Sequence, residues 1–249
     1  MPLHLSRATT DDIRALVDLH YDVTGTSPLT EILIGYDTDA CRRAATERWT
    51  REAAEDPADL WLKVVDLESD GTSEIDSRGG GRGGGGGGGG GEGGRIVSAA
   101  HWKIYPSWPT AVEEGGDPQQ QPWAATQPPV ELDWMPEGSE QRALGEEVVR
   151  KFYAQRAEMQ HGKPHVLLNR LYTHPDYRSR GCASALVRNG CEMADCLFLP
   201  VWVESSPVAE GLYRKHGFDL VCRPDHVRNS KYDMSGPVLR REARGPVVV

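Results

Sequence analysis

Apolar residues follow two different periods along the chain, and segments with one period alternate with segments with the other. Alternating apolar and polar residues, or clusters of β-branched and aromatic residues, predict strands, whereas an apolar residue at every third or fourth position predicts a helix. Strands are predicted at residues 3–7, 60–67, 96–105, 165–173, 201–204, 218–222 and 231–239. Helices are predicted between Thr9 and Gly25 and at residues 38–55, 141–160, 183–197 and 209–215.

Residues with special backbone preferences mark the ends of several elements. Thr9 or Thr10 can cap the first helix, and Gly25 ends it. Asp11 lies in the first turn of that helix, where the helix dipole favours a carboxylate. Pro237 lies in the last predicted strand and indicates an edge strand or an early end, because proline has no N–H to donate. The alternation of strands and helices predicts a mixed α/β (α+β) sheet.

Two segments of biased composition interrupt this pattern. Residues 79–94 are almost all glycine, bury no side chain and have a large backbone entropy, so residues 70–95 are predicted to be a disordered insertion. The insertion replaces the turn of a hairpin, which is tolerable because loop closure costs free energy only logarithmically in loop length. Residues 106–136 are rich in proline and glutamine without a period, which predicts an irregular loop. One domain over residues 1–249 is therefore expected.

Charge and cysteine content narrow the class of protein. The formal net charge of −9 argues against a nucleic-acid partner and an anionic membrane surface, and it favours a cationic substrate. The five cysteines form no CxxC pair and have no zinc-ligand spacing, so we expect reduced thiols, no metal site, and a location in the cytoplasm or nucleus. Residues 1–10 contain no apolar signal segment, and no apolar stretch approaches the roughly 18 residues that span a bilayer, so we expect a soluble protein.

Residues 171–184 carry the clearest chemical signal. They combine a strand, a turn at Pro175 and a loop of small residues that opens a helix. Gly181 and Ala183 allow a ligand to approach the backbone, and the unpaired N–H groups of the helix suit an anion such as pyrophosphate. A tight turn between a strand and a helix also occurs without any ligand, so both interpretations stay open at this point. The sequence contains neither the Gly-Lys-Ser/Thr of a P-loop nor a GxGxxG dinucleotide motif.

Two motifs of the chain resemble consecutive motifs of one known family. Residues 178–183 read RSRGCA and resemble the motif R/Q-x-x-G-x-G/A. Residues 206–218 read SPVAEGLYRKHGF and resemble the motif N-x-x-A-x-x-x-Y-x-K-x-G-F that follows it. The family is that of the GNAT acetyltransferases. The resemblance covers residues 145–221, while the N-terminal part matches only in the order of its elements. The segments THPDY (173–177) and VESS (203–206) are also similar to those of fungal members.

The resemblance implies a mixed, V-shaped sheet that is splayed between its fourth and fifth strands and flanked by helices. It implies acetyl-CoA as co-substrate, with pantetheine in the splay and a main-chain N–H near Tyr172 or Thr173 stabilising the thioester oxygen. The residues implied to contact acetyl-CoA are Leu171, Tyr172, Thr173, Arg178, Ser179, Arg180, Gly181, Cys182, Ala183, Ser184, Ser206 and Tyr213. Ser206 departs from the usual asparagine, which puts one contact in doubt, and Cys182 is expected to be packed rather than reactive.

Tyr213 is the residue that the resemblance implies as general acid. A phenol with a pKa of about 10 can protonate the departing coenzyme A sulfur. The alternative role is a core tyrosine that packs the short helix against the sheet. For the general base, Glu204 and His174 are candidates and His101 is a weaker one; a strand-end carboxylate and a turn histidine are the alternative roles of the first two. A base that acts through water, with no essential side chain, also stays open.

The sequence therefore predicts an acyltransferase that moves an acetyl group from acetyl-CoA to a primary amine on a small molecule or a protein. A CoA-binding sensor or interaction module without catalysis is the alternative. An RNA-associated protein is a third reading, since residues 78–84 faintly resemble an RGG segment, but the tract has two arginines and no interleaved aromatic residues. The acceptor and the oligomeric state are not defined by the sequence.

Overall fold

The computed structural model describes residues 2–68, 94–105, 132–160 and 163–245. Most of the predicted glycine-rich insertion, and of the predicted proline- and glutamine-rich loop, lies outside these described residues. The described ends of both segments are ordered parts of the fold. Arg95 already belongs to a strand, and Leu132 and Met135 are buried in a hydrophobic cluster although residues 132–136 have no regular secondary structure.

Seven strands form one mixed sheet, which confirms the predicted fold class. The strands are β1 (Leu3–Arg7), β2 (Asp59–Asp66), β3 (Arg95–Tyr105), β4 (His165–Thr173), β5 (Val201–Glu204), β6 (Asp219–Cys222) and β7 (Val238–Arg241). Their order across the sheet is β1-β2-β3-β4-β5-β7-β6. Neighbouring strands are antiparallel except β4 and β5, which are parallel. β2 and β3 pair antiparallel, as the predicted hairpin requires.

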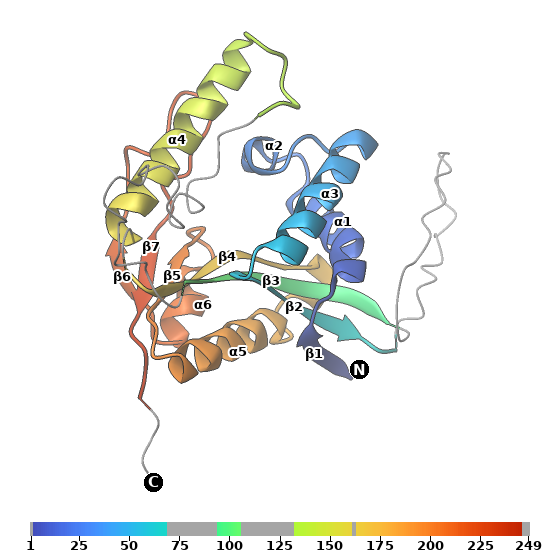
Figure 1. Ribbon diagram of the computed structural model, residues 1–249, viewed down its shortest axis with the longest axis vertical. Coiled ribbons are helices and arrows are strands. Elements are labelled where there is room, and N and C mark those ends of the chain that lie inside the picture. Colours follow the sequence, from blue (N-terminus) through green and yellow to red (C-terminus); the bar gives the residue numbers. More distant parts are fainter. Residues whose placement is uncertain (1, 69–93, 106–131, 161–162, 246–249) are drawn as a thin grey trace.

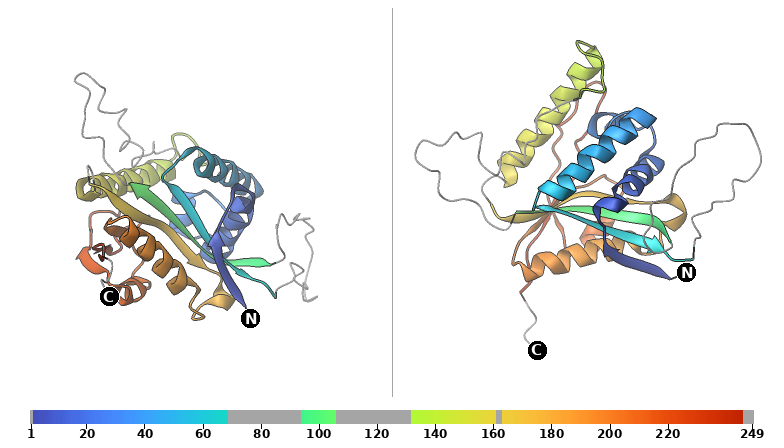
Figure 2. Two further views of the ribbon diagram at one scale, coloured as in Figure 1. Left: turned by 60° about the horizontal axis from the view of Figure 1, so that its bottom comes forward. Right: turned by 45° about the vertical axis from the view of Figure 1, so that its right-hand side comes forward.

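Helices cover both faces of the sheet (Figures 1 and 2). They are α1 (Ile13–Thr24), α2 (Pro28–Leu33), α3 (Asp39–Glu55), α4 (Glu140–Gln160), α5 (Cys182–Cys196) and α6 (Glu210–Lys215). α5 and α6 lie against one face, and the other four helices lie on the opposite side. The sequence did not predict α2, whose six residues are too few to show a helical period but whose N-cap, Ser27, accepts a hydrogen bond from the Thr30 N–H.

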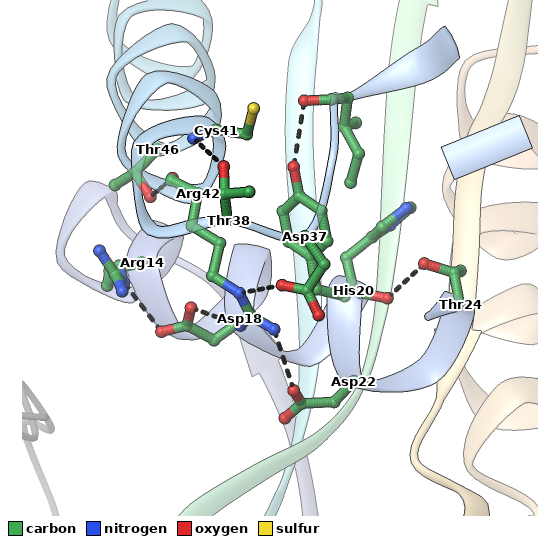
Figure 3. A network of polar contacts seen from close by, with 12 residues as sticks. Arg14, Asp18, His20, Asp22, Thr24, Asp37, Thr38, Cys41, Arg42 and Thr46 are labelled. Carbon is green, nitrogen blue, oxygen red and sulfur yellow. Dashed lines mark hydrogen bonds and ion pairs between the residues drawn. The ribbon is translucent and has the colours of Figure 1, made fainter. Parts of the chain in front are cut away.

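The N-terminal helices are fixed by caps and by one arginine. Thr9 and Asp12 form a capping box ahead of α1, and Gly25 at its end has a φ of 57°. Figure 3 shows Arg42 of α3 reaching three carboxylates at once, two of them on α1 and one in the segment that precedes α3. These carboxylates belong to Asp18, Asp22 and Asp37. The network ties α3 and the segment before it to α1.

The prediction for the last strand was wrong. β7 starts at Val238, directly after Pro237, and it lies between β5 and β6 rather than at an edge of the sheet. Proline is tolerated there because it precedes the ladder and needs to offer only its carbonyl, which accepts a hydrogen bond from the Ser205 N–H. Most of the predicted span is instead an irregular segment that turns around Asn229.

β4 and β5 separate at a β-bulge. His101 of β3 pairs with Arg170, while the next residue of β3, Trp102, pairs with Leu168, so Asn169 is an extra residue in β4. Pairing with β5 ends at the same place, since only residues 166–168 of β4 pair with β5. A bulge bends its strand and commonly terminates pairing. The expected splay between the fourth and fifth strands is therefore present, and its cause is visible.

α5 lies very close to the sheet at one glycine. Gly190 faces Trp102 of β3, and a Cβ atom at this position would lie 2.0 Å from Cζ2 of the indole ring. Trp102 is fully buried in the core cluster that also contains Leu186 and Val187 of α5. The absence of a side chain at Gly190 thus allows α5 to lie this close to β3, the strand next to β4.

We predict that Gly190→Ala lowers the free energy of unfolding by about 3 kcal/mol, because the methyl group cannot fit without displacing a buried indole. Urea unfolding measures the effect. Gly211→Ala is the matched control, since nothing lies within 4 Å of a Cβ at that helical glycine; it should change stability by less than about 1 kcal/mol. Equal stability of Gly190→Ala and the wild type would contradict the close approach.

Candidate active site

The end of β4 directs backbone groups into the splay. The His174 N–H donates to the Val97 carbonyl of β3, over 2.8 Å. Since backbone groups of successive strand residues point to opposite sides, those of Tyr172 also face β3, and those of Leu171 and Thr173 face away from it. β5 does not pair with this part of β4. Leu171 and Thr173 therefore offer backbone hydrogen-bonding groups on the open side of the strand.

Tyr172, by contrast, belongs to the interior. Its carbonyl accepts a hydrogen bond from the Ser98 hydroxyl, and its own hydroxyl donates to the Leu16 carbonyl of α1 over 3.0 Å. The side chain is buried in the cluster formed by α1 and α3, and burial raises the pKa of its phenol. Of the two residues expected near the thioester oxygen, only Thr173 directs its N–H toward the splay.

A tight turn connects β4 to α5. Residues Pro175–Tyr177 form one turn of 3-10 helix, and the Tyr177 hydroxyl donates to Asp66 of β2 over 2.6 Å. The Arg180 guanidinium lies over the Tyr177 ring, 4.9 Å from its centroid. Arg178 is exposed in the same turn. The turn is thereby anchored to the sheet, with two arginines on its outer side.

The N-terminus of α5 has the backbone of an anion site. Ser179 and Gly181 have φ values of 60° and 86°, which turn the chain sharply into the helix. Ala185 is the first residue of α5 whose N–H reaches a carbonyl, that of Gly181, at 2.9 Å. The N–H groups of residues 182–184 have no backbone acceptor among the described residues. No atom lies within 4 Å of a Cβ at Gly181, so the space before these donors is open.

The side chains of this first turn are used locally. The Cys182 thiol is buried and donates to the Tyr177 carbonyl, and burial raises its pKa. The Ser184 hydroxyl lies 2.8 Å from Nε2 of His216, which follows α6. This contact links the two segments that carry the sequence motifs.

Tyr213 of α6 is buried among apolar side chains. Its ring lies 5.6 Å from that of Phe218, edge to face, within the core cluster beneath the sheet. Burial raises the pKa of the phenol. Ser206 is exposed at the end of the segment that follows β5.

Glu204 and His174 are held by partners. Glu204 accepts two hydrogen bonds from Arg156 of α4, at 2.9 and 3.0 Å, in a bidentate pair that is largely shielded from solvent. Nε2 of His174 lies 2.9 Å from the Arg95 guanidinium, and its Nδ1 accepts from the Asp176 N–H. Glu204 thus has the surroundings of a strand-end carboxylate with a structural partner, and His174 has those of a turn histidine.

His101 belongs to a buried polar pair that the sequence did not indicate. Its Nε2 lies 2.5 Å from Oδ1 of Asp59, and its ring stacks on Trp61 with the ring planes 2° apart. Nδ1 receives donors from Arg170, at 2.8 Å, and Asn169, at 3.1 Å. Burial lowers the pKa of His101 to about 4 despite the nearby carboxylate. The histidine is therefore neutral, with Nε2 donating to Asp59 and the Nδ1 lone pair occupied.

Aromatic rings surround the same part of β4. His20 of α1 lies 5.0 Å from Tyr172 and 5.7 Å from Trp49, edge to face in both contacts. The Arg170 guanidinium lies 4.6 Å from the centre of the Trp49 ring. Burial, assisted by the charge of Arg170, lowers the pKa of His20 to about 3. The side of β4 that faces α1 and α3 therefore carries aromatic rings and the positive charge of Arg170. We call it the aromatic side of the splay.

The family model described as "Acetyltransferase (GNAT) domain" matches residues 141–220. These residues include the bulged strand, the anchored turn, the N-terminus of α5 and Tyr213. Residues 141–220 of the chain therefore match a GNAT acetyltransferase domain. The match ends at β6, so it contains both motifs by which the sequence resembled the family.

Solved structures with the GNAT fold extend the likeness to nearly the whole chain. A histone acetyltransferase HPA2 and related acetyltransferase from Corynebacterium glutamicum is 14% identical, with a TM-score of 0.53 and 100% of both chains covered. Arylalkylamine N-acetyltransferase 2 from Aedes aegypti is 9% identical, with a TM-score of 0.56 over 98% of this chain and 100% of that one. At these identities the likeness shows the fold. No curated protein matches the sequence.

Within the described part of the chain, no helix is long and apolar enough to pass through a membrane. The same residues contain no group of three or more His, Cys, Asp or Glu side chains arranged to hold a metal ion.

We predict that acidification destabilises the protein through His20 and His101. Both have pKa values lowered by burial, to about 3 and about 4, whereas an unfolded histidine titrates near about 6.5. Below that pH the unfolded chain binds more protons than the folded one, so stability present above pH 6.5 is lost as the pH falls toward 4. Each histidine contributes up to about 1.4 kcal/mol per pH unit.

Urea unfolding between pH 4.5 and 7.5 measures this slope in the wild type and in His20→Phe. The variant removes a buried Nδ1 that has no partner among the described residues and keeps an aromatic ring against Trp49. Below pH 6.5, the free energy of unfolding of the variant should fall less steeply with falling pH, by about 1.4 kcal/mol per pH unit. Above pH 7, the free energies of unfolding of the two proteins should differ by a constant amount. Identical slopes would contradict a neutral, buried His20.

Proposed function

We propose that the protein is an N-acetyltransferase that transfers the acetyl group of acetyl-CoA to a primary amine by direct attack. The observation that carries the proposal is the splay, into which Leu171 and Thr173 direct backbone groups. It is followed, within a short turn, by the open N-terminus of α5. An extended ligand with a pyrophosphate at one end fits this order of groups: a strand edge first, then an anion site.

The residues present fit acetyl-CoA. Pantetheine carries amide groups that can pair with Leu171 and Thr173 as an added strand does. The pyrophosphate would accept hydrogen bonds from the N–H groups of residues 182–184, at the positive end of the helix dipole. Arg178 and Arg180 lie on the outer side of the same turn, where they add positive charge.

The chemistry requires little covalent participation by the protein. The amine nitrogen attacks the thioester carbon, the N–C bond forms, the C–S bond breaks, and coenzyme A leaves as a thiolate. The Thr173 N–H would stabilise the negative charge that develops on the carbonyl oxygen. Tyr213 would protonate the departing thiolate, since the raised pKa keeps its hydroxyl protonated at neutral pH. The proton that the nitrogen loses as the amide forms would return the phenolate to a phenol through water, so the products are the amide and coenzyme A thiol.

The acceptor amine loses its proton to water in this mechanism rather than to one side chain. Three observations support this choice: the Glu204 carboxylate is paired with an arginine, His174 lies between two partners, and the free lone pair of His101 is occupied by two donors. Removing a proton from an amine of pKa about 10.4 is then a pre-equilibrium with solvent. The acceptor is an amine on a small molecule or a protein; the name of the Aedes aegypti structure specifies arylalkylamines for that enzyme.

We predict that Gly181→Glu weakens acetyl-CoA binding by at least about 100-fold, which is about 2.7 kcal/mol. A carboxylate at this position would stand before the N–H groups meant for pyrophosphate, and a side chain would be strained at a φ of 86°. Calorimetric titration measures the affinity. Gly138→Glu is the matched control, because that glycine also has a positive φ of 72° and open space, outside the residues that the family model matches. Wild-type affinity in a folded Gly181→Glu variant would refute the pyrophosphate site.

We predict that Tyr213→Phe lowers kcat by about 100-fold while changing the acetyl-CoA dissociation constant by less than about threefold. The ring and its contact with Phe218 are retained, and only the hydroxyl is lost. Thiol release at saturating amine gives kcat. Tyr105→Phe is the control, since Tyr105 is also buried with a raised pKa but lies in a different cluster of the core. Unchanged kcat would remove Tyr213 from the mechanism.

A further inference from the structure

Two arginines lie on the aromatic side of the splay without a carboxylate partner. Arg170 donates to His101 and lies over Trp49, and Arg48 of α3 lies over Trp134, 5.5 Å from the ring centre. One terminal nitrogen of Arg48, Nη2, is buried and has no hydrogen-bond partner among the described residues. Neither guanidinium forms an ion pair within the part of the chain that the structure describes.

Other shielded arginines of the chain are paired. Arg156 binds both oxygens of Glu204, Arg241 binds both oxygens of Asp195, and Arg42 reaches three aspartates. Taking a cation out of water without a counter-charge is costly, which is why buried charges are normally paired. Arg48 and Arg170 are exceptions to this pairing, and their lack of a counter-charge among the described residues needs an explanation.

The two guanidinium groups belong to one region of the protein, since Arg170 lies over Trp49, the residue next to Arg48 in α3. Burial lowers the pKa of Arg48, and the charge of Arg170 lowers it further. Glu52 and Asp133 act on Arg48 in the opposite direction, but neither is within ion-pair distance among the described contacts. A negatively charged group between the arginines would relieve the repulsion and use the unpaired donor. Carboxylates fit best, since the planar fork of arginine matches their two oxygens.

The position of this pair relates it to the acceptor rather than to acetyl-CoA. Arg170 follows the bulge at Asn169 and precedes Thr173 by three residues, about 10 Å along a strand. Its guanidinium lies over Trp49 of α3, and α3 and α5 lie on opposite sides of the sheet (Figure 1). A carboxylate held there would keep an amine of the same molecule within reach of a thioester at Thr173.

We infer that the acceptor is an amine that also carries a carboxylate, which Arg48 and Arg170 bind. The inference rests on the proposed acetyltransferase function and specifies its substrate class. The overall charge of −9 favours a cationic substrate, and such an acceptor keeps the cationic amine while its carboxylate meets a local positive site. The indole rings of Trp49 and Trp134, beneath the two guanidinium groups, add apolar surface for the rest of the molecule.

Matched pairs of amines test the inference. Phenylalanine and phenethylamine differ only by the carboxylate, as do leucine and 3-methylbutylamine. Thiol release gives kcat/KM for each at saturating acetyl-CoA. The wild type should prefer the member with the carboxylate by at least about tenfold, which corresponds to one charge-assisted hydrogen bond.

Arg48→Gln should lower kcat/KM for phenylalanine by about 10- to 100-fold and that for phenethylamine by less than about threefold. Arg48→Lys should restore part of the preference because it restores the charge. Arg51→Gln, an exposed arginine on the same helix, is the matched control and should change neither value. Arg170→Gln would also remove a donor to His101, so Arg48 is the cleaner position.

The outcomes separate this inference from the proposed function. Equal activity on both members of a pair, or an equal loss for both in Arg48→Gln, would overturn the carboxylate site and leave the acetyltransferase intact. Calorimetry with phenylalanine alone gives a second readout. Binding of phenylalanine that Arg48→Gln abolishes, in a protein that does not bind acetyl-CoA, would support the carboxylate site and overturn the acetyltransferase, and with it the acceptor role.

Discussion

The bulge at Asn169 is the constraint on which the arrangement of the site depends. Up to Leu168, β4 pairs with β3 on one side and with β5 on the other; after the bulge, only β3 remains a partner. The extra residue bends β4 away from β5 and leaves the backbone groups of Leu171 and Thr173 without a strand to pair with. An unpaired strand edge inside a sheet is normally a liability, and here it is where an extended ligand can bind.

The same bulge sets the polar contacts on the aromatic side. Asn169 and Arg170, on either side of the irregularity, both reach Nδ1 of His101, and Asp59 holds the opposite nitrogen. This chain of contacts keeps His101 neutral and leaves Arg170 without a carboxylate among the described residues. Glu204, at the end of β5, differs from Arg170 because its charge is fully matched by Arg156. Among the described residues, an unpaired charge at the splay is therefore found on the β4 side, at Arg170, and not at Glu204.

Local patterns in the sequence were sufficient for most of the fold. Alternation and helical periodicity predicted the strands and the longer helices, and the small residues after Pro175 predicted the turn that opens α5, because each depends on neighbours in the chain. α2 was missed since one and a half turns show no period. The order of β7 in the sheet was missed because Pro237 is compatible with both an edge strand and the first position before a central one.

The parts of the site that could not be predicted depend on contacts between distant segments. Asp59 and His101 are 42 residues apart, and the bulge that brings Arg170 to the same histidine arises from one extra residue in the pairing of two strands. Arg48 has no feature in the sequence that distinguishes it from the exposed arginines of α3. Only the structure, in which Arg48 lies over Trp134 with a buried Nη2, shows that it lacks a partner among the described residues.

Calorimetric titration of the wild-type protein with acetyl-CoA, coenzyme A and NADPH tests the central claim most directly. The splay and the open N-terminus of α5 predict micromolar binding of both CoA ligands and none of NADPH, since the chain has no dinucleotide motif. A folded protein that binds neither CoA ligand would contradict the account, because the strand edge and the anion site would then be features of the fold without a ligand.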